Sequence, residues 1–280
     1  MLKAKKKFGQ NFLKDESILT QIIQAIPKQT TPDFGGRVVE IGPGLGDLTS
    51  WLLKSGYSVS SYEIDDDLVP HLEQKFADFA KDGRFKLIHK DANLAWDEQG
   101  SLLDRPYIMV ANLPYYVATK MVLNALKDGF CAGVIAMVQK EVAIKFTCKG
   151  RESEFSSLGV LANINAKTEL LFDVAPECFE PAPKVMSSVF KISKEQKLIA
   201  PDGVFASFSE YEKFQSFLKS SFSSPRKTLL KNLSQICDKA FLNEAFASLE
   251  LSQNIRPHEL NALLYLKIYN IIKAKNERKQ

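Results

Sequence analysis

Over about its first 190 residues the sequence alternates short β-rich runs with helical patterns, and this alternation constrains the fold more than any other feature. The runs predict strands at residues 37–41, 58–63, 85–89, 107–110 and 134–138. Helical patterns separate or follow them at 47–54, about 66–78, 118–126 and 140–146. A repeated strand–helix–strand order favours a parallel sheet with helices on both faces. We therefore predict a doubly wound, Rossmann-like α/β domain.

The character of the chain changes after this region. Residues 175–184 are proline-rich, which excludes a helix or an inner strand, and a further strand is expected at 185–192. Beyond Pro201 helical patterns dominate, at about 208–221, 226–232, 243–248 and 258–273. With the boundary placed between Lys194 and Gly203, we predict a sheet domain at 1–197 and a small helical domain at 198–280.

Composition excludes several classes of protein. The chain is 45% apolar and 25% charged, which is ordinary for a globular protein and excludes wholesale disorder. The longest clean apolar run, Val134–Val138, is far too short to span a membrane. The basic N-terminus has no apolar core after it and does not resemble a signal peptide. We expect a cytoplasmic protein without a membrane partner.

Cysteine and histidine spacing argues against a metal centre. The four cysteines contain no C-x-x-C pair, and the three histidines are scattered along the chain. A zinc site needs ligands at short spacing. We expect no metal, and we expect the cysteines to be reduced and buried.

Charge is distributed unevenly along the chain. Residues 1–7 carry four lysines and no acid, and residues 201–280 carry 12 basic and 8 acidic residues. The segment between them is slightly acidic. Two basic ends are compatible either with simple solubility or with binding to a polyanion.

A glycine-rich loop follows the first predicted strand, reading Glu40-Ile-Gly42-Pro-Gly44-Leu-Gly46. Glycines at this place let the backbone approach a ligand closely. Glu63 ends the next strand, 21 residues after Gly42, where an acid suits the two hydroxyls of a ribose. The combination indicates a cofactor that contains adenosine.

Asp47, at the start of the following helix, distinguishes between two cofactors. A pyrophosphate such as that of NAD needs the helix N-terminus, and a carboxylate there repels it. S-adenosylmethionine (AdoMet) has no phosphate and carries a sulfonium cation, so Asp47 favours AdoMet. The alternative is a tight turn in which Asp47 caps the helix. Asp91, after the third strand, is placed either to accept a hydrogen bond from an adenine amine or simply to form a turn.

After the fourth strand comes Asn112-Leu113-Pro114-Tyr115-Tyr116. The amine of adenine is a poor nucleophile because its lone pair is delocalised into the ring. The Asn112 side-chain oxygen and the carbonyl of Leu113 or Pro114 are positioned to accept its two N–H bonds, and Tyr115 to stack on the base. Positioning then suffices for an in-line methyl transfer. The alternative is a loop with a core tyrosine.

These motifs, taken together, resemble the KsgA/RsmA family of small-subunit ribosomal RNA adenine-N6,N6-dimethyltransferases. The resemblance spans nearly the whole chain. It rests on the segments at 8–13, 40–46, 112–115, 137–143, 179–189 and 226–232, on Glu63 and Asp91, and on Arg256-Pro257.

The resemblance implies roles for individual residues. The residues expected to bind AdoMet are Asn11, Leu13, Gly42, Gly44, Glu63, Asp91 and Asn112. Those expected at the reacting amine are Asn112, Leu113 and Pro114, with the base between the rings of Tyr115 and Phe179. The implied reaction is double methylation of two adjacent adenosines near the 3′ end of 16S ribosomal RNA during assembly of the small (30S) subunit. We expect the protein to act as a monomer on the pre-30S particle.

Two other functions are compatible with parts of the sequence. A related large-subunit methyltransferase shares the cofactor motifs, but Leu113 and the longer C-terminal region favour the small-subunit enzyme. A ribosome-assembly factor without catalysis is the third possibility, and the intact Glu63, Asp91, Asn112 and Tyr115 argue against it.

Overall fold

The structure, a computed structural model, describes residues 4–27 and 34–277. Contacts along the chain divide it into two compact units. The first comprises Met1–Ala143 and Thr168–Lys194, and the second Ile144–Lys167 and Glu195–Gln280. The predicted domain limits differ from these units in residues 144–167 and 195–197. Residues 144–167 belong to the helical unit because α8 (Ser157–Asn163) packs on α12 (Ala262–Glu277).

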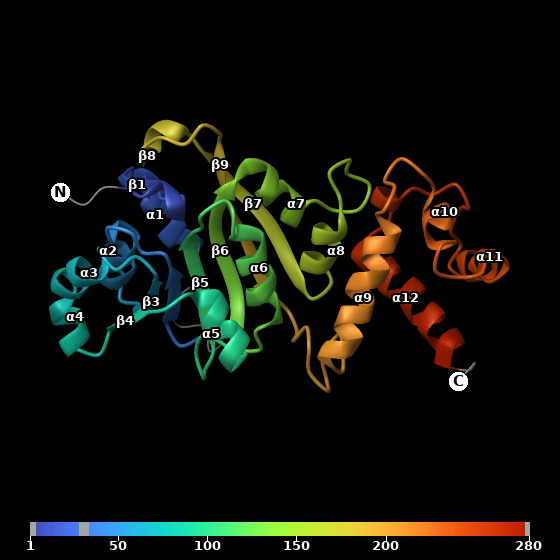
Figure 1. Cartoon of the computed structure of the whole chain (residues 1–280), viewed down its shortest axis with the longest axis horizontal. Coiled ribbons are helices and arrows are strands. Elements are labelled where there is room, and N and C mark those ends of the chain that lie inside the picture. The colour runs from blue at the N-terminus through green and yellow to red at the C-terminus, as the bar shows by residue number, and fades with distance from the viewer. Residues whose placement is uncertain (1–3, 28–33, 278–280) are drawn as a thin grey trace. The chain divides into compact units, whose positions relative to one another are not determined.

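The first unit is built on a seven-stranded sheet in the order β4-β3-β2-β5-β6-β9-β7. Figure 1 shows strands of this sheet as arrows, with helices of the unit around them. The strands are β2 (Arg37–Ile41), β3 (Ser58–Glu63), β4 (Phe85–His89), β5 (Tyr107–Asn112), β6 (Cys131–Gln139), β7 (Ala166–Val174) and β9 (Ser187–Lys194). The pairs among β2 to β6 are all parallel, and β9 runs antiparallel to β6. The predicted doubly wound α/β sheet is confirmed.

The direction in which successive strands are added to the sheet changes at β2. Strands β3 and β4 lie on one side of it, and β5 and β6 lie on the other. Ligands of such sheets bind at the carboxyl ends of the strands beside this switch point. The chain leaves β2 at Ile41 and β5 at Asn112, which places the glycine-rich loop and the Asn112 segment at the same edge.

Helices of the first unit follow the strands. They are α1 (Glu16–Ala25), α2 (Asp47–Lys54), α3 (Val69–Lys75), α4 (Ala77–Lys81), α5 (Ala92–Gln99), α6 (Ala118–Lys127) and α7 (Lys140–Thr147), of which α7 runs into the second unit. The single helix expected at about 66–78 is wrong. Phe76 leaves the helical conformation and buries its ring against Phe85, so two short helices replace it.

A second, two-stranded sheet ties the N-terminal segment to the proline-rich one. β1 (Phe12–Leu13) pairs antiparallel with β8 (Phe179–Glu180), with Leu13 opposite Phe179. Both side chains are buried in the core of the sheet unit. Short 3₁₀ turns precede these strands, at Lys6–Phe8 and Pro176–Cys178. The prediction that residues 175–184 form neither a helix nor an inner strand agrees with this arrangement.

The second unit is helical around an aromatic core. Its remaining elements are α9 (Phe208–Ser221), α10 (Leu229–Leu233), α11 (Lys239–Ser248) and the 3₁₀ turn Pro257–Glu259. The rings of Phe214, Phe217 and Tyr269 pack on one another with centroids 5.2–6.0 Å apart. Such ring contacts stabilise a small core beyond the area that they bury.

Candidate functional site

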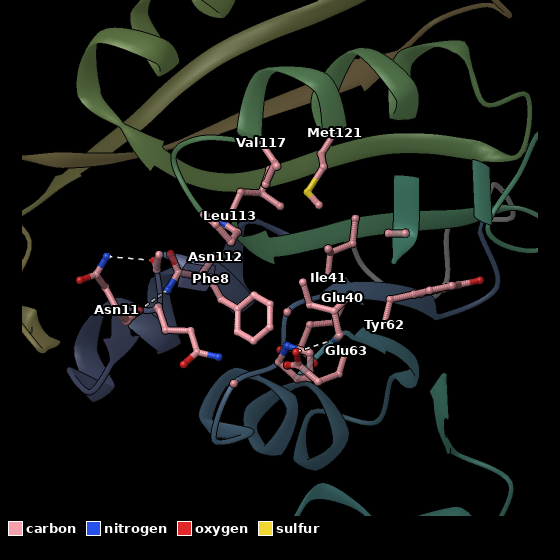
Figure 2. A pocket seen from close by; sticks show the side chains of 18 of the residues that line it. Phe8, Asn11, Glu40, Ile41, Tyr62, Glu63, Asn112, Leu113, Val117 and Met121 are labelled. Carbon is pink, nitrogen blue, oxygen red and sulfur yellow. Dashed lines mark hydrogen bonds between the residues drawn. The ribbon is translucent and has the colours of Figure 1, made fainter. Parts of the chain in front are cut away.

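One pocket of the sheet unit collects the carboxyl ends of β2, β3 and β5, the start of α5 and the N-terminal segment (Figure 2). Ten of the predicted site residues line it, namely Asn11, Leu13, Gly42, Gly44, Glu63, Asp91, Asn112, Leu113, Pro114 and Tyr115. Residues that lie more than 100 positions apart in the chain therefore meet in one place. Phe179 is the predicted site residue that does not line the pocket.

The glycine-rich loop has the backbone that its sequence predicts. Gly42 and Gly44 both have positive φ, 65° and 58°, a region that favours glycine. A Cβ atom on Gly44 would lie 2.8 Å from the Phe12 ring, whereas one on Gly42 would meet no atom within 4 Å. Gly42 thus exposes bare backbone to the pocket. Gly46, also at positive φ, is the N-cap of α2, so Asp47 does not cap the helix and instead pairs with Lys14 at 2.6 Å.

Glu63 is held in place by the turn that follows it. Its Oε1 accepts hydrogen bonds from the backbone N–H groups of Ile64 at 2.7 Å and Asp65 at 2.9 Å. Burial raises the pKa of Glu63, and the amides of Asp65, Ile64 and Gly44 oppose that rise. These fixed amides orient a carboxylate that remains able to accept further hydrogen bonds from a ligand.

Asp91 has a structural role that the sequence left open. It is the N-cap of α5, and its Oδ1 accepts the backbone N–H of Asn93 at 2.7 Å. The same side chain lines the pocket. A carboxylate has about four lone-pair sites, so capping does not exclude binding a ligand amine.

Asn112 is oriented by the N-terminal segment. Its Nδ2 donates to the backbone carbonyl of Asn11 at 2.9 Å (Figure 2). Among the described residues no donor reaches Oδ1, and Asn112 lines the pocket. The amide therefore presents an acceptor to whatever lies there.

The two candidate carbonyls beside Asn112, those of Leu113 and Pro114, differ in whether they already accept hydrogen bonds. The Pro114 carbonyl already accepts the backbone N–H groups of Val117 and Ala118, both at 3.1 Å. In the part of the chain that is described, no donor reaches the Leu113 carbonyl. Leu113 O is thus the better second acceptor for an amine that is bound at Asn112.

Tyr115 is fixed by a partner that the sequence analysis missed. Its Oη lies 2.8 Å from the Oγ of Ser187 on β9, a residue that is only 1% exposed. Burial raises the pKa of Tyr115. Nothing in the sequence links positions 115 and 187, although Ser187 lies within a segment that carries the family resemblance.

The predicted second face of a base sandwich is not formed in this structure. Phe179 is 6% exposed and packs in the hydrophobic core, because the pairing of β8 with β1 places it opposite Leu13. Tyr115 is therefore the aromatic of the predicted pair that faces the pocket.

Glu40 is a buried carboxylate in the pocket wall that the sequence analysis did not single out. It is 1% exposed, and its Oε2 accepts hydrogen bonds from Thr49 at 2.6 Å and Ser61 at 2.9 Å. Burial raises its pKa to about 7.

We expect this burial to make the stability of the protein depend on pH. Between about pH 4.5 and 7 the folded chain keeps a proton on Glu40 that the unfolded chain releases, so the free energy of unfolding falls as the pH rises. The total loss is about 3 kcal/mol. In Glu40→Gln the hydroxyls of Thr49 and Ser61 keep an acceptor, and we expect no such loss of unfolding free energy between about pH 4.5 and 7. Urea unfolding of both proteins at pH 5 and pH 8 measures it, and parallel pH dependences would contradict the assignment.

Two kinds of site are absent from the described residues. Neither residues 4–27 nor 34–277 contain a group of three or more histidine, cysteine or acidic side chains arranged to hold a metal ion. The helices of these same ranges include none that is long and apolar enough to cross a membrane.

The fold and the pocket define a class of α/β proteins that hold a small ligand at the carboxyl ends of parallel strands. Within that class, residues 1–274 match the family model described as ribosomal RNA adenine dimethylase. The chain belongs to this family and is therefore a methyltransferase that acts on adenine in ribosomal RNA. The family resemblance inferred from the motifs is confirmed.

Individual relatives agree with this assignment. A protein of Campylobacter curvus named ribosomal RNA small subunit methyltransferase A is 56% identical over 280 residues, which are 100% of this chain and 96% of that protein. The crystal structure of a dimethyladenosine transferase from Plasmodium falciparum has a TM-score of 0.74 at 20% identity, covering 95% of this chain and 98% of the other. That of the 23S rRNA methyltransferase ErmE has a TM-score of 0.69 at 21% identity, covering 94% and 100%. The two solved structures support the Rossmann-like fold.

Proposed function

We propose that the protein transfers methyl groups from AdoMet to the N6 amines of two adjacent adenosines near the 3′ end of 16S ribosomal RNA. The product is N6,N6-dimethyladenosine, formed in the cytoplasm on the assembling small subunit by a monomeric enzyme. The observation that carries the proposal is the Asn112 amide, which is held by Asn11 and offers its oxygen to the pocket.

The chemistry of the pocket wall fits AdoMet better than a phosphate-bearing cofactor. Among the described residues of the wall, Asp47, Glu63 and Asp91 contribute carboxylates and Lys90 an ammonium. Glu40, with a pKa of about 7, is only partly ionised near neutral pH, and Asp47 is already paired with Lys14, so the negative charge left for a ligand comes mainly from Glu63 and Asp91. This balance suits a ligand with a sulfonium and an ammonium and repels a pyrophosphate. We assign the ribose to Glu63, the adenine amine to Asp91 and the close backbone contact to Gly42 and Gly44. Asn11, Leu13 and Asn112 complete the cofactor site.

AdoMet, when bound, supplies a methyl group on a good leaving group. The protein then has to hold the target amine in line with the bond between the methyl group and the sulfur. It also has to reduce the delocalisation of the amine's lone pair into the adenine ring. We assign the two N–H acceptors to Asn112 Oδ1 and Leu113 O, because the Pro114 carbonyl is already engaged by Val117 and Ala118. Tyr115, fixed by Ser187, supplies the stacking surface for the flipped base. This is catalysis by positioning, which needs no strong base.

Small-subunit RNA is the proposed substrate because full-length relatives with 41–56% identity carry the small-subunit name. We assign RNA contact to basic residues of the helical unit, such as Lys227 and Lys231, and to the N-terminal lysines. Of the latter, Lys3 lies outside the described residues, and the ammonium of Lys5 is paired with Asp65 and Asp67. Lys5 is therefore a poor candidate for a phosphate contact.

Transfer of labelled methyl from AdoMet to undermethylated small ribosomal subunits tests the proposal, with large subunits alongside and with product nucleosides identified by mass. We expect dimethyladenosine in small subunits alone. Label in large subunits would replace this function by that of a large-subunit methyltransferase. No label in either, with AdoMet still bound, would indicate an assembly factor.

A further inference from the structure

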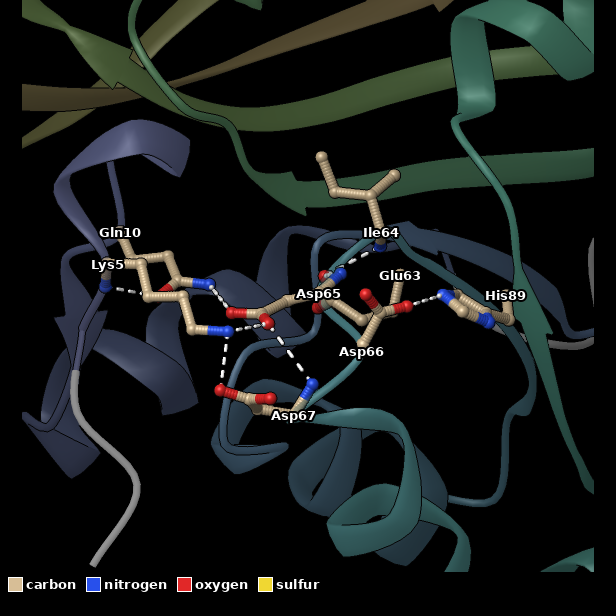
Figure 3. Close-up of polar contacts among 8 residues, drawn as sticks. All are labelled: Lys5, Gln10, Glu63, Ile64, Asp65, Asp66, Asp67 and His89. Atoms are coloured by element: carbon tan, nitrogen blue, oxygen red, sulfur yellow. Dashed lines mark hydrogen bonds and ion pairs between the residues drawn. The ribbon is translucent and has the colours of Figure 1, made fainter.

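The N-terminal segment at residues 5–13, here called the strap, is joined by polar contacts to the loop after Glu63 (Figure 3). The Lys5 ammonium pairs with the carboxylates of Asp65 and Asp67. Gln10 donates from Nε2 to Asp65 Oδ2 at 2.9 Å, and its Oε1 accepts the backbone N–H of Lys5 at 2.7 Å. Gln10 thereby connects the turn at the start of the strap with the loop after Glu63.

Asp65 is the centre of these contacts. Its side chain is 2% exposed, and it also accepts the backbone N–H of Asp67 at 3.2 Å. Burial acts to raise the pKa of Asp65, but the hydrogen bonds from Lys5, Gln10 and the Asp67 amide outweigh it, so the pKa is lowered. Hydrogen bonds to an ionised carboxylate are stronger than those between neutral groups, and they are screened less by salt where the carboxylate is buried.

The strap reaches the reacting centre one residue after Gln10. The carbonyl of Asn11 accepts the Asn112 amide at 2.9 Å, and two residues later Leu13 pairs with Phe179. The same loop carries Glu63, whose Oε1 is held by the amides of Ile64 and Asp65. The strap therefore connects the cofactor side of the pocket with the target-amine side.

We infer that Gln10 and Asp65 are positioning residues for the proposed methyl transfer, which fix the strap so that the Asn11 carbonyl holds the Asn112 amide with its oxygen toward the substrate. The inference rests on the proposed function for its kinetic part. The inference goes beyond the proposed function because neither Gln10 nor Asp65 is assigned a hydrogen bond to the reacting amine. Without the bond between them, the strap keeps the Lys5 ion pairs and the pairing of Leu13 with Phe179 but loses the contact nearest to Asn11, and the Asn112 amide rotates more freely.

A charge-neutral exchange of the two partners tests the inference. Gln10→Glu places a second carboxylate against Asp65 and breaks the bond by repulsion. In the double variant Gln10→Glu with Asp65→Asn, the new amide donates to the new carboxylate, and the net charge equals that of the wild type. We expect Gln10→Glu to lower kcat by at least about tenfold, as for a lost charge-assisted hydrogen bond, and the double variant to recover most of the loss.

Hydrogen–deuterium exchange of the strap amides, without cofactor or RNA, supplies a readout that is independent of activity. We expect faster exchange at residues 5–13 in Gln10→Glu and restored protection in the double variant. Asp66→Asn is the matched control, because Asp66 lies on the same loop and pairs with His89 at 3.0 Å instead of with the strap. It should exchange and turn over like the wild type.

The outcomes separate this inference from the proposed function. An inactive wild type would remove the proposed function, while the exchange data would still report on the link between Gln10 and Asp65. An active wild type with unchanged exchange and kcat in Gln10→Glu would overturn the inference. Restored protection without restored kcat in the double variant would also overturn it, because the contact would then stabilise the strap without positioning Asn112.

Discussion

Replacing Asn112 with alanine is expected to lower kcat by about 10²–10³-fold, the range seen when one preorganised hydrogen-bonding group is removed from a reacting centre. The Asn112 oxygen is one of two acceptors proposed for the target amine, and its Nδ2 is anchored 2.9 Å from the Asn11 carbonyl. Alanine removes the acceptor, and Leu113 O remains. Single-turnover methyl transfer at saturating AdoMet and RNA measures the effect.

Binding measurements distinguish a catalytic role of Asn112 from a structural one. RNA affinity should stay within about twofold of the wild type, because the assigned phosphate contacts lie elsewhere. Asn254→Ala, at an exposed asparagine outside the pocket, is the matched control. A parallel loss of kcat, RNA affinity and unfolding free energy in Asn112→Ala would mean that Asn112 mainly holds the strap.

Local patterns predicted the elements that form the cofactor edge. The bounds of β2, α2 and β3 agree with the predicted residues, because each of these runs ends at a charged residue or directly before a glycine. β7 was missed because its burial does not alternate regularly, so its residues do not read as a half-buried strand. The break at Phe76 was also missed, since it follows from the packing of its ring against Phe85 of the next strand, which the helical pattern of this segment does not encode.

The candidate site shows the same division between local and long-range information. The positive φ of Gly42 and Gly44 could be expected from the motif alone. The hydrogen-bond partners of the site's side chains could not be predicted from the motifs. Ser187 contacts Tyr115 because of the topology of the sheet, and Asn11 contacts Asn112 because of the course of the strap. Long-range pairing also places Phe179, whose ring is buried opposite Leu13, and its role at the base stays a prediction.

Glu63→Gln is expected to weaken AdoMet binding by about 1.5–3 kcal/mol, the range for a hydrogen bond to a charged group. Glutamine keeps an oxygen for the amides of Ile64 and Asp65, so the turn that holds residue 63 should persist. What is lost is the negative charge and one acceptor for the ribose hydroxyls. Isothermal titration with AdoMet measures the change in affinity.

Glutamine is a sharper test than alanine at this position. Alanine would leave the backbone N–H groups of Ile64 and the buried Asp65 without their acceptor, and the cost of that loss would add to the loss of the ligand contact. Asp66→Asn, an exposed acid on the same loop, controls for a general change of charge near the pocket. Equal affinities of Glu63→Gln and wild type would exclude the ribose role, and the carboxylate would then serve only to order the loop that holds the strap.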